Sequence, residues 1–398
     1  MRALFRNRLF VSVVVGHFGV DVLNSIGPVL LAVLAAPLAL SNARIGVALT
    51  MYTFASSLLQ PVFGWLADRV RGRAVVVAGL GAAWMVIWFA AVALTHSWAW
   101  LLPCFLLAAI GSAIFHPIGT AQAAAADPAR AATATAVFFF CGQLGLAVGP
   151  VLGGLFFGWS GSGGILLLGL GALLGAGLML VAPAPAPAPP NAARRAAPVV
   201  QATALALVAF VLLVAVRSSI QATYAAFLPK LFADRGWEPA LFGALAGAFM
   251  LAAAIGNLVS GGLADTYGMR RATVLPLLLG VPAGLLCLWA PTPATAFGAS
   301  ALTGVCVGGQ HSVLVVHAQR LLPTGKSFAS GLILGFTFAA GGVGTWLGGS
   351  AADSVGLLLV MQIVTLLGLP CALLALTLPG RARPEHVTAP ADAAPAQR

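Results

Sequence analysis

Long apolar stretches, separated by short polar segments, run through almost the whole chain. Each stretch approaches or exceeds the roughly 20 mostly apolar residues that an α-helix needs to cross the hydrocarbon core of a bilayer. Charged residues, glycines and prolines mark where the stretches end. Twelve transmembrane helices are therefore predicted, over residues 9–36, 45–67, 74–94, 98–123, 131–157, 163–182, 199–228, 241–264, 272–290, 294–318, 328–349 and 355–378.

A break in this pattern divides the predicted helices into two sets of six. The segment from Pro183 to Pro190 is built of alanine and proline and leads into Arg194 and Arg195, a composition typical of an extended spacer. The tail after residue 380 is rich in alanine, proline and charge and has no apolar face, so we expect it to be disordered. The predicted organisation is an N-terminal bundle over 1–182, a cytoplasmic linker over 183–198, a C-terminal bundle over 199–380 and a cytoplasmic tail over 381–398.

Short motifs recur between the two sets at a nearly constant offset. Residues 64–69 (GWLADR) return as 261–266 (GGLADT), 149–154 (GPVLGG) as 344–349 (GTWLGG), 43–46 align with 240–243, and His116 aligns with His311. This recurrence indicates an internal duplication. Two parallel six-helix repeats place a substrate site near the middle of the bilayer, between the halves.

Composition and charge support a membrane protein and give its orientation. Hydrophobic residues make up 60% of the 398 residues, charged residues only 7%, and the mean hydropathy is +1.01. The chain therefore has too few polar residues to form the surface of a water-soluble protein. With the N-terminus in the cytoplasm, most of the 20 Lys and Arg residues fall on the cytoplasmic side of the predicted helices. The net charge of +11 therefore reflects topology rather than nucleic-acid binding, and both termini are expected to be cytoplasmic.

Asp21 is the carboxylate that lies within the predicted spans. It falls near the middle of the first predicted helix, with His17 one turn before it and Asn24 on the next turn of the same face. A carboxylate at that depth is costly and indicates function, although a structural hydrogen-bond cluster would also account for it. We expect Asp21 and His17 to couple transport to protons, with Arg217 of the seventh helix as the counter-charge.

Other polar residues within the predicted helices are candidates for a substrate cavity. The whole expected cavity set is Asn24, Gln60, His116, Gln143, Arg217, Gln221, Tyr224, Gln310 and His311. The five cysteines are scattered singly and are interpreted as small core residues rather than metal ligands. No nucleotide-binding or zinc-protease motif occurs. We therefore expect no catalytic residue, no cofactor and no metal, and a protein that acts as a monomer.

The repeated loop motif resembles the loop between helices 2 and 3 of the major facilitator superfamily. The resemblance implies gating loops built from Gly64, Asp68 and Arg69 in the first half and from Gly261, Asp265 and Arg270 in the second. The first copy departs from the family pattern, because glycine follows Asp68 by four residues instead of three. A second pattern, on the fifth helix, resembles a motif of the superfamily's antiporters, although close helix packing alone would also explain its glycines. It consists of Gly145, Gly149, Pro150, Gly153 and Gly154.

Three further stretches look like the fosmidomycin-resistance branch of that superfamily: residues 16–21 (GHFGVD), 55–64 (ASSLLQPVFG) and 111–117 (GSAIFHP). This resemblance implies a multi-pass protein of the bacterial inner membrane that exports a small molecule, such as a fosmidomycin-like antibiotic, in exchange for protons by alternating access. A metabolite symporter or exporter of the same superfamily is the main alternative, and a channel or a polytopic membrane enzyme is more remote. The expected partners are a small-molecule substrate, protons and the lipid bilayer, without nucleic acid.

Overall fold

The computed structural model describes residues 4–67, 69, 73–126, 131–183, 203–321 and 326–380. Within these ranges the chain forms helices and turns and no strand. The first half contains η1 (Leu4–Arg6), α1 (Arg8–Ser25), α2 (Gly27–Leu34), α3 (Asn42–Leu58), α4 (Gln60–Ala67), α5 (Ala74–Ala93), α6 (Trp98–Ala126), α7 (Ala131–Ser160), η3 (Gly161–Gly163) and α8 (Gly164–Leu180). The second half contains α9 (Ala204–Ala233), α10 (Pro239–Tyr267), α11 (Met269–Leu288), α12 (Pro293–Gly308), α13 (His311–Leu321), α14 (Lys326–Val355), α15 (Leu357–Leu366) and α16 (Gly368–Ala375).

Several membrane-length stretches consist of two helices that meet at a break. The helices α1 and α2 meet at Ile26, just before Pro28, and α3 meets α4 just before Pro61. Proline cannot donate the backbone hydrogen bond that would continue the helix, which accounts for both breaks. The pairs α12 with α13 and α15 with α16 are likewise continuous stretches with a local interruption.

Ten stretches of the described chain are long and apolar enough to cross a membrane. One of them, Val137–Leu180, contains most of α7 together with α8. The 30-residue α14, which contains the predicted eleventh span, is not among the ten. The helices are therefore consistent with twelve crossings, and the all-α integral membrane fold expected from the sequence is confirmed.

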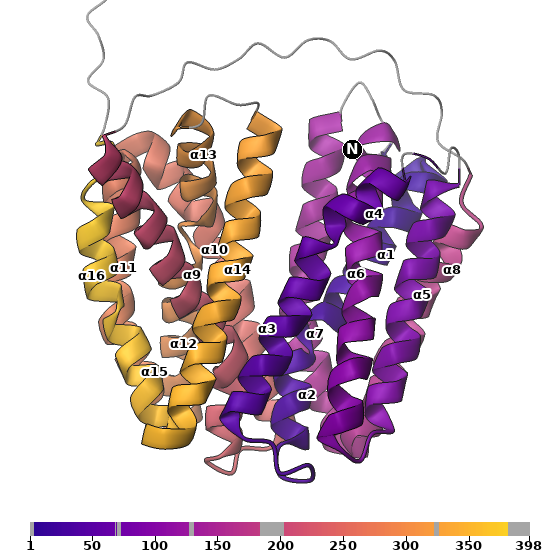
Figure 1. Cartoon of the computed structure of the whole chain (residues 1–398), viewed down its shortest axis with the longest axis horizontal. Helices are drawn as coiled ribbons and strands as arrows, with labels where there is room; N and C mark the ends of the chain where they lie inside the picture. The colour runs from indigo at the N-terminus through magenta and orange to yellow at the C-terminus, as the bar shows by residue number, and fades with distance from the viewer. Residues whose placement is uncertain are drawn as a thin grey trace, which may run out of the picture.

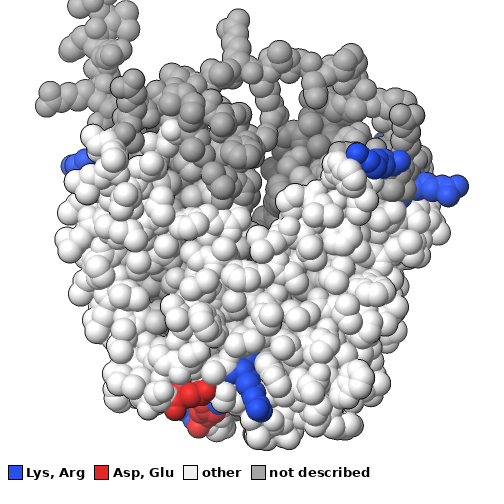
Figure 2. All heavy atoms as spheres, viewed as in Figure 1, with Lys and Arg blue, Asp and Glu red and all other residues white. Residues whose placement is uncertain are grey.

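The helices form two bundles that lie side by side (Figure 1), one from each half of the sequence. The start of α1 and the end of α16 lie at the same end of the molecule (Figure 1), which we call the termini end. The opposite end, called the distal end, carries the α2–α3, α9–α10 and α14–α15 junctions (Figure 1). Acidic side chains on the face seen in Figure 2 gather at this distal end. The expected linker, apart from Pro183, and the C-terminal tail lie outside the described residues.

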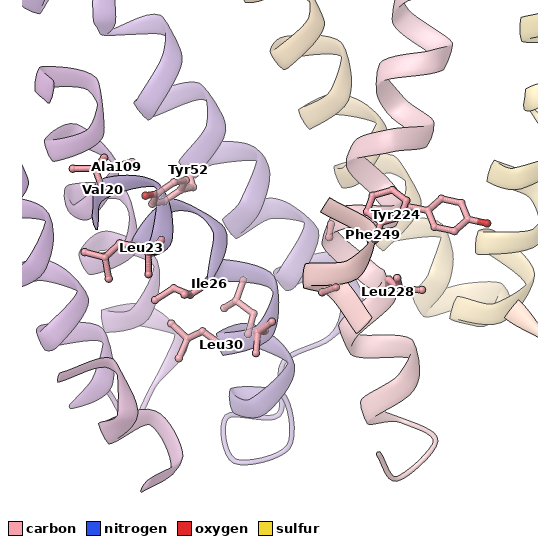
Figure 3. Packing of buried hydrophobic residues seen from close by; sticks show 14 of the residues in the cluster. Val20, Leu23, Ile26, Leu30, Tyr52, Ala109, Tyr224, Leu228 and Phe249 are labelled. Carbon is pink, nitrogen blue, oxygen red and sulfur yellow. The ribbon is translucent and has the colours of Figure 1, made fainter. Parts of the chain in front are cut away.

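Each bundle has its own packed interior. In the first half, Val20, Leu23 and Leu30 of α1 and α2 are at most 1% exposed and point between neighbouring helices (Figure 3). In the second half, Leu228 of α9 and Phe249 of α10 are equally buried. Many other large apolar side chains are exposed, for example on α8 and α11, as expected for helices that face lipid.

Backbones of the two halves meet closely near the distal end. A Cβ atom at Gly46 of α3 would lie 2.9 Å from the Thr345 carbonyl oxygen of α14. The repeat-equivalent Gly243 of α10 packs in the same way on Gly154 of α7, where an added Cβ would lie 2.8 Å from its Cα. Because glycine has no side chain, these helices can approach to backbone contact. The duplicated small-residue motifs therefore form the two seams, α3–α14 and α7–α10, that hold the halves together.

Candidate functional site

Three side chains from two helices converge deep inside the first bundle. His17 and Asp21, one turn apart on α1, lie with Nε2 and Oδ2 3.1 Å apart. His116 of α6 approaches the other carboxylate oxygen, with Nε2 3.3 Å from Asp21 Oδ1. His17 is 2% exposed and Asp21 5%. We call these three residues the His–Asp–His cluster.

Helix α7 closes the cluster from the side. The ring of His17 stacks on Phe138, with centroids 3.9 Å apart. One turn further along α7, a Cβ atom at Gly142 would overlap the His17 ring and the Asp21 carboxylate. The local sequence of α7 thus provides one flat ring to orient His17 and one glycine to leave room for the cluster.

The outer nitrogens of both imidazoles bond to backbone carbonyls. His17 Nδ1 lies 2.8 Å from the Phe138 oxygen, and His116 Nδ1 lies 2.9 Å from the Ser112 oxygen. A carbonyl only accepts, so we assign a hydrogen to each Nδ1. Each Nε2 then faces a different oxygen of Asp21, and each contact needs one further proton to be a hydrogen bond. A proton in each contact would complete two hydrogen bonds, one to each carboxylate oxygen.

The cluster also has the spacing of a possible metal site. The donor atoms of His17, Asp21 and His116 all lie within 4.8 Å of one another. Each ring faces its own carboxylate oxygen, however, which is the arrangement of two separate hydrogen bonds.

Asn24 connects the cluster to the space between the halves. Its side-chain amide donates to Asp21 Oδ1 at 2.8 Å and to Ser112 Oγ at 3.1 Å. Its own Oδ1 accepts a hydrogen bond from the hydroxyl of Tyr52 at 2.7 Å. Asn24 and Tyr52 both line a cavity of about 370 Å³. A short hydrogen-bonded chain thus runs from the cavity wall to the carboxylate.

The cavity lies between the two halves and is lined from both. Of the residues expected from the sequence, Asn24, Gln143, Gln221 and His311 line it. Serine and threonine hydroxyls, Tyr52 and apolar side chains complete the described wall. These groups can exchange hydrogen bonds with a small polar molecule and cover its apolar parts.

Arg217 does not pair with Asp21 in this structure, which corrects the expectation from sequence. It is 1% exposed, and its Nε and Nη2 donate to the carbonyls of Val307 and Gly308 at 3.0 and 2.8 Å. These carbonyls end α12, where the helix leaves orphan acceptors with negative partial charge. Arg217 therefore stabilises the break between α12 and α13, while the histidines satisfy Asp21.

Four further expected cavity residues are also placed elsewhere. Tyr224 bonds to Thr365 at 2.5 Å and is 1% exposed, because it lies seven residues after Arg217 and so faces the same side of α9, away from the cavity. Gln60 donates to the Ser56 carbonyl within its own helical stretch. Gln310 is fully buried at the α12–α13 break and donates to the carbonyl of Cys306. His116 belongs to the cluster instead of the cavity wall.

The expected gating loops are described only in part. Asp68 and the side chain of Asp265 lie outside the described residues. Arg69 donates to the Trp65 carbonyl at 2.9 Å and lies over the ring of that residue. Arg270 donates to the Leu378 carbonyl at 2.9 Å, which joins α11 to the segment after α16. Gly64 of α4 faces Pro117 of α6, and Gly261 has open space around it apart from Ser312.

The glycine–proline motif of the fifth predicted helix lies on α7 and contacts two partners. Gly145 and Gly149 pack on the backbone of α1, where an added Cβ would overlap Phe18 and Val22 carbonyl oxygens. Gly154 packs on α10 of the other half, and Pro150 lies inside α7 between these contacts. Gly153 faces Ile26 at the α1–α2 break. The motif thus joins the helix that carries Asp21 to a seam between the halves.

Sequence reasoning missed Tyr52, Ser112 and Gly142, which complete the surroundings of the cluster. Tyr52 is one of only three tyrosines in the chain and falls within a predicted span, which is the one signal that could have identified it. Ser112 lies in the 111–117 stretch that resembles the fosmidomycin-resistance branch, which was the available signal for it, whereas Gly142 is a common residue type in such helices and gave none.

Comparisons with known proteins agree with this architecture. The profile of the Major Facilitator Superfamily matches residues 9–227 and 205–397. The fosmidomycin resistance protein of Escherichia coli (strain K12) is 27% identical over 380 residues, covering 90% of this chain and 89% of that protein. The uncharacterized MFS-type transporter YfnC of Bacillus subtilis (strain 168) is 27% identical over 367 residues and 88% of each chain.

The fold is also similar to that of solved transporters. A bacterial homolog of the human lysosomal transporter Spinster, in an inward-facing and occupied conformation, superposes with a TM-score of 0.75 at 16% identity, covering 91% of this chain and 95% of that one. Two bundles, a cavity between them and a family match that spans nearly the whole sequence lead to one conclusion. The chain belongs to the Major Facilitator Superfamily of membrane transporters and is not an enzyme.

Proposed function

We propose that this protein is a proton-coupled antiporter that exports a small molecule across the bacterial inner membrane. The observation that carries the proposal is the His–Asp–His cluster, whose two Nε2–carboxylate contacts each require a proton. Export as the direction is supported by the likeness to the Escherichia coli fosmidomycin resistance protein. The substrate class suggested by that relative is a fosmidomycin-like antibiotic.

Proton release from the cluster would change the packing of α1 against α6. When one of the two protons leaves, two acceptor lone pairs face each other across one contact, and that contact opens. The His116 side chain is 20% exposed whereas that of His17 is 3% exposed, so we assign proton exchange with water to His116. Loss of the His116–Asp21 contact removes one of the polar contacts between α6 and α1, which would connect the protonation state to helix movement.

Substrate binding would reach the same carboxylate through Asn24. A substrate that forms a hydrogen bond with the Tyr52 hydroxyl or the Asn24 amide would weaken or replace the hydrogen bond that Asn24 donates to Asp21 Oδ1. Protons act on the Asp21 carboxylate directly and the substrate acts on it through Asn24. If the two exclude each other there, the protein would exchange one for the other, which is antiport. The gating loops around Asp68 and Asp265 would act separately, by stabilising one conformation at the termini end, as the family resemblance implies.

Transport assays distinguish the antiporter from its alternatives. Cells that express the protein should grow at higher concentrations of at least one compound in an inhibitor panel that includes fosmidomycin. Inside-out vesicles should accumulate that compound when their interior is acidic, and a protonophore should abolish the accumulation. Accumulation in right-side-out vesicles driven by an inward proton gradient would instead assign the metabolite symporter. Uptake at the same rate with and without a proton gradient would show that transport is not coupled to protons.

A Tyr52→Phe substitution tests the connection between the cavity and the cluster. It removes the hydroxyl that bonds to Asn24 and keeps the buried ring. We expect the proton flux that accompanies transport to fall roughly two- to tenfold, the range for one net hydrogen bond of about 0.5–1.5 kcal/mol. Substrate-dependent alkalinisation or acidification of vesicles measures this flux.

The matched control is Tyr224→Phe. Tyr224 is also buried, but its hydroxyl bonds to Thr365 in the second half, away from the cavity. It should leave the flux unchanged. Equal losses in both variants would mean that Tyr52 acts only through packing.

A further inference from the structure

At the distal end, a carboxylate of the second half binds the first turn of a helix of the first half. Asp353, in the last turn of α14, accepts hydrogen bonds from the backbone N–H groups of Asn42 at 2.8 Å and Ala43 at 3.0 Å. These are the first two residues of α3. The hydroxyl of Ser41 accepts from the N–H of Arg44 at 3.2 Å. The first three N–H groups of α3 are thus all bonded, two of them across the halves.

This contact lies at the end of the closely packed α3–α14 seam. A Cβ atom at Gly349 would overlap the carbonyl oxygen of Asn42, so the two backbones touch one turn away from Asp353. Two turns further along α3, the buried Thr50 hydroxyl donates to the Gly342 carbonyl at 2.6 Å. Asp353 is itself exposed, so it caps the seam where the seam meets solvent.

The surroundings favour the charged form of Asp353. Partial burial by itself raises the pKa of this carboxyl, but the hydrogen bonds from Ala43, Ser41 and Asn42 outweigh it and hold the pKa below its usual value. The positive end of the α3 dipole acts in the same direction. Arg44 is engaged elsewhere, because its guanidinium lies over the Trp98 ring, 5.8 Å from the centroid.

The repeat-equivalent seam has no such contact. By the internal alignment, Gly158 of α7 corresponds to Asp353, and the start of α10 at Pro239 corresponds to the start of α3. Glycine offers no carboxylate and proline offers no N–H. Glu238, which precedes α10, makes no side-chain cap. The carboxylate contact is therefore specific to one of two otherwise similar seams, so seam packing alone does not require it.

We propose that Asp353 acts as a latch that holds the distal end closed and must release α3 before the transporter can open there. Separation of the seam exposes the N–H groups of Asn42 and Ala43 and leaves the carboxylate to water. The contact therefore exists in only one of the two conformations of an alternating-access cycle and biases the population toward it. This inference does not depend on the substrate or on proton coupling.

Distance measurements between spin labels test the latch in the full-length protein. Cysteines at His96 and Pro291 place one label on each half at exposed positions of the distal end, and Cys141→Ser removes the native cysteine that is not fully buried. Asp353→Ala should raise the ratio of open to closed distal ends by about fivefold, the change that corresponds to loss of a typical helix N-cap. Asp353→Asn, which keeps one acceptor and the size of the side chain, should give a smaller shift in the same direction.

Thr203→Ala is the matched control, because it removes a side-chain N-cap that bonds the N–H of Ala206 in its own helix α9 and does not touch the other half. It should leave the open-to-closed ratio within about twofold of the parent, even if it lowers stability. An unchanged ratio in both Asp353 variants would overturn the latch. So would an equal shift in Thr203→Ala, since the effect would then come from the loss of any helix cap rather than from the contact between the halves.

Discussion

Replacing Asp21 with asparagine should abolish proton-driven transport while leaving the protein folded in the membrane. Asparagine can donate to one imidazole and accept from the other, so it can keep both contacts that the carboxylate now makes. It cannot, however, change its charge when a proton arrives or leaves. We expect the gradient-dependent rate to fall by about two orders of magnitude or more, as for other side chains that must transfer protons.

The measurement is accumulation of substrate in inside-out vesicles, normalised to the amount of protein in the membrane. Asp234→Asn provides the matched control, since Asp234 pairs with Lys230 outside the described cavity and should tolerate the change. Exchange of labelled for unlabelled substrate without a gradient should persist in Asp21→Asn. If gradient-driven accumulation also persists, the coupling acid is not in the cluster.

Replacing Arg217 with alanine should destabilise the protein rather than change its coupling to protons. The substitution removes two charge-assisted hydrogen bonds, each worth about 1.5–3 kcal/mol, and leaves the Val307 and Gly308 carbonyls without these donors. We therefore expect a loss of roughly 3 kcal/mol or more in unfolding free energy, seen as a lower midpoint of thermal unfolding in detergent. Arg235→Ala, which removes a single bond to the Leu288 carbonyl at a partly exposed site, should cost less.

The double variant of Asp21→Asn and Arg217→Ala tests whether Arg217 acts on the α12 carbonyls, as in the structure, or pairs with Asp21, as expected from the sequence. The two residues share no hydrogen-bond partner in this structure, so their effects on stability should add. If the double variant loses clearly less unfolding free energy than the two single variants together, Arg217 is the counter-charge of Asp21 after all.

The sequence was most informative where a single helix or the bilayer determines the outcome. The length and apolar character of the helices follow from the thickness of the membrane, so their approximate bounds could be predicted, and the described helices are consistent with the predicted twelve. His17, Asp21 and Asn24 were grouped correctly because spacings of three and four residues place them on one face of one helix. The paired glycines near Gly46 and Gly243 were visible through the internal repeat.

Contacts between helices were predicted less well, because local spacing does not determine how helices cross. His116 was recognised as a candidate, but its approach to Asp21 depends on the packing of α6 against α1. Arg217 was assigned to Asp21 because the two are nearly repeat-equivalent, whereas its side chain points toward α12. Asp353 was missed because it follows the predicted eleventh span and looks like an ordinary surface acid until α3 is seen against it.

The anchoring of Arg217 has a consequence for the electrical behaviour of the transporter. Its charge is fixed to the backbone of the second half, whereas the charge that the proposed proton exchange would change lies in the first half, at the His–Asp–His cluster. Moving one elementary charge fully across a potential of 100 mV changes the energy by about 2.3 kcal/mol, and moving it a tenth of the way by about 0.2 kcal/mol. When the two halves rock against each other, both charges shift within the membrane field. Turnover should therefore respond to membrane voltage as well as to the proton gradient, even with an uncharged substrate.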